Sequence, residues 1–184
     1  NLKMAKQTTI AKSVTLKGVG IHTGEEVTMT FKPAPANHGY AFQRIDLEGS
    51  PIIEALAQHV ADTKRGTSLQ KNGVTIQTSE HVLAALVGCE VDNLLIELNA
   101  SEPPIMDGSS KFFVEAIDKV GVKTLDAERE EYVVKENITY TEEETGSEIT
   151  LLPADNYQVT TMVDFGTKVL GTQNANLKKL SQFK

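Results

Sequence analysis

Residues 78–121 read TSEHVLAALVGCEVDNLLIELNASEPPIMDGSSKFFVEAIDKVG, and this stretch contains two helix patterns with a strand pattern between them. The first helix opens at hydroxyl residues that can cap it and is predicted to end at Gly88. The second opens at a pair of serines, carries apolar residues at helical spacing and is predicted to end at Gly121. Residues 93–98 form a nearly continuous apolar run, which is typical of a buried strand.

Strands are predicted on the amino-terminal side of this stretch. They alternate apolar with polar residues or flank an Asn-Gly dipeptide that favours a hairpin, and they cover 8–16, 27–31, 39–47, 67–69 and 74–76. Residues 51–62 are ambiguous, because their apolar spacing fits a helix although the segment is barely long enough for one. Strands combined with helices indicate the α+β class. We therefore predict a two-layer α+β domain at residues 8–125.

The strand pattern starts again beyond residue 131. Strands are predicted at 132–134, 138–141, 149–152 and 157–165, and a helix is predicted to begin at residue 176. One unfinished helix gives little cover to a four-stranded sheet, and domains of this size are marginal even when whole. We expect residues 132–184 to be the truncated start of a second α+β domain of similar topology. Residues 1–7 are expected to be a flexible start, and residues 126–131 an acidic linker.

The composition is that of a globular protein. The chain has 184 residues, of which 40% are hydrophobic and 23% charged, so it can bury a core. No apolar run is long enough to cross a bilayer, and stable membrane insertion is not expected. Cys89 is the one cysteine. It excludes a disulfide framework and a thiolate zinc module, and it favours a cytoplasmic location.

The net charge of −7 comes from one part of the chain. Residues 126–148 hold nine acidic and two basic residues, which account for the whole excess of negative charge. The remainder is neutral and lacks the basic face of a nucleic-acid-binding protein, so no nucleic-acid partner is expected. We interpret the acidic stretch as a solvated connector with charged strand edges.

The strongest chemical signal is Glu80 followed by His81 at a predicted helix start. Free backbone N–H groups and the helix dipole favour an ionised carboxylate there, which can act as a general base, while the imidazole can bind a metal. The same pair also fits a purely structural role, because glutamate is favourable in any first helical turn. Ala84 and Ala85 stand where a second histidine of a helical zinc motif would be.

Three further segments carry polar side chains that can serve a site. His22 lies in a glycine-rich turn at 18–24, which lacks the lysine of a phosphate-binding P-loop. Residues 62–68 combine two cations with hydroxyls and suit an anionic or polar ligand, or simply a solvated loop. Asp107, with Gly108 and Ser109, is interpreted as a structural turn before the second helix rather than as a catalytic group.

Taken together, these motifs resemble one enzyme family. The segments are GVGIHTG at 18–24, PAPAN at 33–37, Glu80-His81 with Ala-Ala-Leu after it, and PIMDGS at 104–109. In this order and spacing they resemble the amino-terminal half of UDP-3-O-acyl-N-acetylglucosamine deacetylase, the zinc hydrolase of bacterial lipid A biosynthesis. The family's architecture is two α+β domains of similar topology with the active site between them, which would make residues 51–62 a strand.

The resemblance implies roles for individual residues. Glu80 matches the general base and His81 a ligand of Zn2+, and the substrate would be UDP-3-O-acyl-N-acetylglucosamine. The loop that follows residue 62 matches a segment lining the site. We expect the following residues to bind substrate: His22, Lys64, Arg65, Gly66 and Thr67.

The family's other two zinc ligands, a histidine and an aspartate, match positions beyond residue 184. The partner that completes the site would be the missing part of the chain's own second domain, and we expect the 184-residue chain to be inactive alone. Two readings remain beside the deacetylase: a non-catalytic ligand-binding or scaffold domain of the same fold, and a phosphotransferase that uses the glycine-rich turn.

Overall fold

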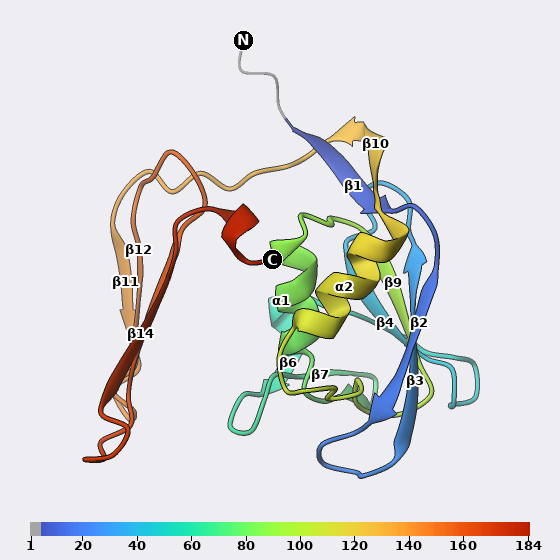
Figure 1. Ribbon diagram of the computed structural model, residues 1–184, viewed down its shortest axis with the longest axis horizontal. Coiled ribbons are helices and arrows are strands. Elements are labelled where there is room, and N and C mark those ends of the chain that lie inside the picture. Colours follow the sequence, from blue (N-terminus) through green and yellow to red (C-terminus); the bar gives the residue numbers. More distant parts are fainter. Residues whose placement is uncertain (1–4) are drawn as a thin grey trace. The chain divides into compact units, whose positions relative to one another are not determined.

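The computed structural model describes residues 5–184, which divide into two compact units (Figure 1). Unit 1 reaches Arg129, and unit 2 is Glu130–Phe183. A flexible start was predicted at residues 1–7. Residues 1–4 of it lie outside the described residues, and its last two residues, 6 and 7, belong to a strand. No helix in the described residues has both the length and the apolar character needed to cross a membrane.

Unit 1 is built on a five-stranded sheet with the order β2-β3-β9-β4-β5. Its strands are β2 (Val14–Val19), β3 (Glu26–Pro33), β4 (Tyr40–Arg44), β5 (Ile52–Glu54) and β9 (Leu94–Leu98). Only the β4–β9 pair is parallel. The alternation in β3 and β9 puts one face of the sheet inside, where Met29 is in register with Leu98 and Phe31 with Ile96.

Two helices, α1 (Glu80–Gly88) and α2 (Lys111–Val120), cover the buried face of this sheet (Figure 1). Phe113 of α2 lies against Phe31 of β3, with ring centroids 6.4 Å apart. Both rings are buried. Strands on one side and helices on the other confirm the predicted two-layer α+β class.

Two smaller sheets complete unit 1. One contains β6 (Val60–Asp62), β7 (Ser68–Lys71) and β8 (Val74–Ile76); the other pairs β1 (Lys6–Ile10) with β10 (Val122–Glu128). Residues 51–62 hold β5, a short 3-10 turn at Ala57–His59 and β6, so the helical spacing was misleading there. The strand β10 continues through residues 126–128, the first half of the segment predicted to be a linker.

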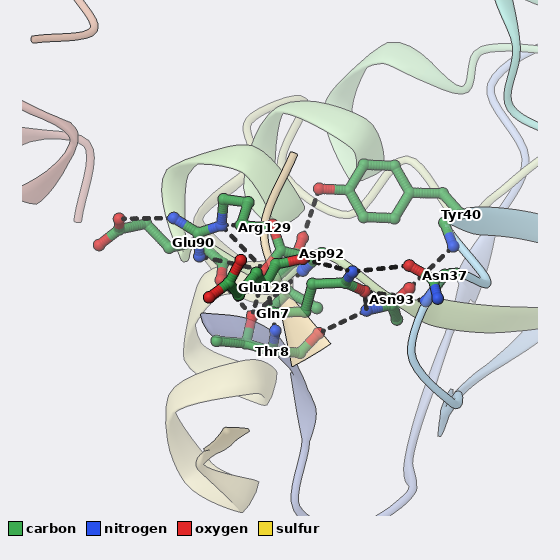
Figure 2. Close-up of polar contacts among 11 residues, drawn as sticks. Gln7, Thr8, Asn37, Tyr40, Glu90, Asp92, Asn93, Glu128 and Arg129 are labelled. Atoms are coloured by element: carbon green, nitrogen blue, oxygen red, sulfur yellow. Dashed lines mark hydrogen bonds and ion pairs between the residues drawn. The ribbon is translucent and has the colours of Figure 1, made fainter. Parts of the chain in front are cut away.

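A polar network joins the first and last strands of unit 1 (Figure 2). The Asp92 carboxylate accepts hydrogen bonds from the Thr8 amide at 2.8 Å and from the Arg129 guanidinium at 3.0 and 3.1 Å. Beside it, the Gln7 amide group bonds to Asn37 and Asn93. Because Asp92 directly follows the end of α1 and its turn, this network ties both ends of unit 1 to the helical layer.

Unit 2 consists of two separate antiparallel hairpins. They are β11 (Ile138–Thr141) with β12 (Glu148–Leu151), and β13 (Val159–Asp164) with β14 (Thr172–Leu177). The prediction of a strand at 132–134 was wrong, and so was that of a helix from residue 176. Residues 176–177 pair with β13, and only a 3-10 turn, Leu180–Gln182, follows.

Candidate functional site

The start of α1 is attached to the loop before β7. The Ser79 hydroxyl donates to the carbonyl oxygen of Thr67 at 2.8 Å, and the Ser79 amide donates to the same oxygen at 3.1 Å. The predicted capping role of a hydroxyl at this helix start is therefore wrong, since neither Thr78 nor Ser79 caps the helix. Tertiary hydrogen bonds, rather than a local cap, place Glu80 at the first helical position.

Glu80 is held by the same loop. Its Oε2 accepts a hydrogen bond from the Thr67 amide at 2.8 Å. Gly66 has a φ of 139°, and a Cβ built there would lie 3.0 Å from Glu80 Oε1. The loop can approach the carboxylate because residue 66 is glycine. The Glu80 side chain keeps 37% of its surface accessible, so one carboxylate is both fixed and open to a reactant.

His81 lies beside Glu80, with its Nε2 3.8 Å from Glu80 Oε1. One third of its side chain is accessible. Its carbonyl oxygen accepts a hydrogen bond from the Ser110 hydroxyl at 2.8 Å, which joins the starts of α1 and α2. An accessible imidazole next to an accessible carboxylate can bind a cation or exchange a proton.

A polar pocket of about 270 Å3 adjoins this pair. Its lining residues come from three segments of unit 1: His22, Asp62, Arg65, Gly66, Ser68, Gln77 and Thr78. Gly66 belongs both to the pocket and to the Glu80 contact. Thr78 has a φ of 53°, and its hydroxyl is buried without a hydrogen-bond partner among the described residues. The pocket offers cationic, anionic and neutral polar groups together, a mixture that suits a polar ligand with several hydrogen-bonding groups.

The predicted substrate-binding residues are only partly brought together. His22, Arg65 and Gly66 line the pocket, and Thr67 contributes its backbone to Glu80. Lys64 does not line the pocket; its amide bonds to Asp62 in the loop. Gln77 and Thr78 were not predicted as site residues. Their position just before Glu80 was the only available signal.

The Asp107 segment has the contacts of a turn. Asp107 Oδ1 accepts hydrogen bonds from the Ser109 amide at 3.0 Å and from its hydroxyl at 2.7 Å, and these bonds lower the pKa of the exposed Asp107 carboxyl. Gly108 has a φ of 83°. The Ser109 hydroxyl accepts from the Lys111 amide at 3.1 Å and so satisfies a free N–H group at the start of α2.

A metal centre is not complete within residues 5–184. In this part of the chain no group of three histidine, cysteine, aspartate or glutamate side chains lies close enough together to hold a metal ion. Glu80 and His81 are a pair without a third such group. A catalytic zinc ion usually has three protein ligands, and the described residues do not bring three such side chains together.

Comparison with known proteins finds one family. The family model described as UDP-3-O-acyl N-acetylglycosamine deacetylase (LpxC) matches residues 7–184. The chain is 45% identical over 181 residues to a bifunctional enzyme LpxC/FabZ of Bacteroides thetaiotaomicron, a match that covers 98% of this chain and 39% of that protein. It is 38% identical over 175 residues to a UDP-3-O-acyl-N-acetylglucosamine deacetylase of Geotalea uraniireducens, with 95% and 56% covered.

A similar protein of Porphyromonas gingivalis, also named bifunctional enzyme LpxC/FabZ, is 43% identical over 180 residues, covering 98% of this chain and 39% of that protein. The chain thus spans about half the length, or less, of the curated relatives it matches.

Proposed function

Because the chain belongs to the UDP-3-O-acyl N-acetylglycosamine deacetylase family, we propose that it is the amino-terminal part of a hydrolase that removes the N-acetyl group of UDP-3-O-acyl-N-acetylglucosamine. The observation that carries the proposal is the Glu80–His81 pair, accessible at a helix start beside a polar pocket. A scaffold domain has no need of a reactive pair in this position.

Glu80 is the general base in this proposal. The Thr67 amide fixes one carboxylate oxygen and leaves the other free to take a proton from water. The resulting hydroxide attacks the carbonyl carbon of the N-acetyl group. The carbon–nitrogen bond of the tetrahedral intermediate then breaks, and acetate leaves while the sugar nitrogen gains a proton.

His81 supplies one zinc ligand in this proposal. A bound zinc ion would lower the pKa of water and polarise the acetyl carbonyl. One imidazole does not hold zinc at a catalytic site, so we propose that the remaining ligands belong to the missing part of the second domain, beyond this chain. The 184-residue chain alone is then inactive. Purified chain supplied with zinc and the sugar nucleotide should release no acetate, and measurable release would contradict this.

The polar pocket would receive hydrophilic groups of the substrate. Arg65 and His22 can donate hydrogen bonds to sugar or phosphate oxygens, and Gly66 leaves space beside Glu80. Thr67 would act through its backbone amide, and Lys64 belongs to the same loop but does not line the pocket. We propose that the reaction takes place in the cytoplasm, with no nucleic-acid partner and no stable membrane insertion.

The test is a substitution of Glu80 to Gln in the full-length protein. Loss of the base should lower the rate of acetate release by about 100- to 10,000-fold. The control is Glu115→Gln, which changes an exposed glutamate on α2 and should leave the rate unchanged. If Glu80→Gln retained full activity, or if the full-length protein had no deacetylase activity, the non-catalytic binding domain would become the better interpretation.

A further inference from the structure

Glu102 is a fully buried carboxylate under the glycine-rich turn of His22. Its side chain has no accessible surface. One oxygen, Oε1, accepts three hydrogen bonds: from the His22 amide at 3.0 Å, the Thr23 amide at 2.9 Å and the Thr23 hydroxyl at 3.0 Å. His22 and Glu102 are 80 residues apart in the sequence. The carboxylate therefore fixes the backbone of the turn at the residue that lines the pocket.

The turn is shaped around this carboxylate. A Cβ built at Gly20 would overlap both the Glu102 carboxylate and the Thr23 hydroxyl. Gly20 does not have a positive φ, so the glycine is required for space rather than for an unusual backbone conformation. Gly24, which does have a positive φ of 69°, closes the turn with a hydrogen bond from its amide to the Gly20 carbonyl. Gly20 therefore leaves space for the Glu102 carboxylate, whereas Gly24 provides the positive φ that the turn requires.

Burial of the Glu102 carboxyl group costs free energy, because its oxygens lose their hydrogen bonds to water. No lysine, arginine or histidine of the described residues forms an ion pair with Glu102, and its second oxygen, Oε2, is buried without a donor. Burial of a polar oxygen without a hydrogen-bond partner is unfavourable, and such atoms are uncommon in native structures.

We propose that Glu102 is a positioning residue that acts through His22. It holds the His22 backbone so that the side chain lines the pocket beside Gly66, the residue that contacts Glu80. Glu102 itself does not line the pocket, and it takes no part in the contacts of Glu80 with the loop. This inference rests on the proposed function, because it assigns His22 a place in the substrate site.

The structural part is tested on the 184-residue chain by NMR. Glu102→Ala should increase the hydrogen-exchange rates of the His22 and Thr23 amides by about tenfold or more, because both lose their acceptor. Gly20→Ala should give the same response from the other side of the contact. The control is Glu97→Ala, which removes a partly buried glutamate from the neighbouring strand β9 and should leave both amides unchanged. Unchanged exchange in Glu102→Ala and Gly20→Ala would overturn the proposal.

The functional part is tested by a double-mutant cycle in the full-length protein. His22→Ala and Glu102→Ala should each lower kcat/KM by about 10- to 100-fold, because a misplaced site residue loses its alignment with substrate. In the His22→Ala background, Glu102→Ala should change kcat/KM by less than about twofold, since the two act as one unit. Additive losses would mean that Glu102 acts on the fold in general, and would overturn the proposal.

The two experiments separate the two proposals. A wild-type protein without deacetylase activity would refute the proposed function, while the amide exchange rates would still test the Glu102 contact. An active protein with additive losses would refute the positioning role alone. Thr23→Val, which removes one of the three donors and keeps the side-chain shape, provides a milder variant if Glu102→Ala does not fold.

Discussion

Units 1 and 2 are both rich in antiparallel strands, but only in unit 1 is a sheet covered by helices. In unit 1 the inner face of the five-stranded sheet lies under two helices, and side chains such as Ile96 have no accessible surface. Unit 2 buries none of its residues, and Ile149 and Met162 are 65% and 71% exposed. Its two hairpins are separate, and an isolated hairpin is at best marginally stable.

The difference shows that alternating sequence alone does not create a core. β12 carries apolar residues as β9 does, yet only β9 lies between neighbouring strands and beneath helices. A second layer converts an apolar face into buried area. We therefore expect matched substitutions in the two units to have very different effects.

The largest effect is expected from truncation of a core side chain. Ile96→Ala should lower the free energy of unfolding by about 2–5 kcal/mol, because it leaves a cavity in the buried face of the sheet. Ile149→Ala should change it by less than about 0.5 kcal/mol. Urea denaturation of the 184-residue chain measures both. Similar values for the two variants would contradict the proposed difference between the units.

The next effect is expected at the network that ends unit 1. Arg129→Ala should lower the free energy of unfolding by about 1–3 kcal/mol, since Asp92 loses its guanidinium partner. Amides of β1 and β10 should then exchange faster. Lys135→Ala removes a basic residue of unit 2 and serves as the control, with no change expected in either measurement. If the amides of β1 and β10 exchanged as slowly in Arg129→Ala as in the unmodified protein, the Asp92–Arg129 contact would not be what holds these two strands in place.

A smaller effect, dependent on pH, is expected at Asp46. The largely buried Arg44 guanidinium forms two hydrogen bonds to this carboxylate, at 2.7 and 2.9 Å, and lowers the Asp46 pKa from its ordinary value of 3.8. A lowered folded-state pKa stabilises the folded state above the ordinary value, and this stabilisation disappears as the pH falls through the lowered pKa.

Asp46→Asn should therefore reduce stability by about 1–2 kcal/mol at pH 7 and by much less at pH 2. Denaturation at the two pH values gives the comparison. Glu143→Gln, an exposed carboxylate of unit 2, should show no difference at either pH. A deficit in Asp46→Asn that persists unchanged at pH 2 would show that the ion pair is not its cause.

The smallest effect is expected at two equivalent hydroxyls. Ser109 and Thr145 each accept a hydrogen bond from the amide two residues later, at 3.1 and 3.2 Å. Ser109→Ala should lower the free energy of unfolding by about 1 kcal/mol, because the Lys111 amide at the start of α2 loses its acceptor. Thr145→Ala should be nearly neutral, because its hydroxyl lies in an exposed hairpin turn. Thermal unfolding of both variants decides whether the hydroxyl matters only where a helix depends on it.

Sequence reasoning located the helices of unit 1 well but failed where strand pairing decided the outcome. The periodicity of residues 80–88 and 111–120 is local, and both helices are present. The helix predicted from residue 176 was wrong, because residues 172–177 pair with β13. For the site, Glu80 and His81 stood out as neighbours. Gln77 and Thr78 line the pocket without any sequence motif that marks them.

The sequence by itself determined the class of fold, the two helices and the adjacency of Glu80 and His81, because these depend on spacing and torsional preference within a few residues. Only the tertiary structure placed Thr67 on the Glu80 carboxylate and Glu102 beneath His22. The first of these contacts joins residues 13 positions apart and the second joins residues 80 positions apart, and no local sequence pattern encodes either of them.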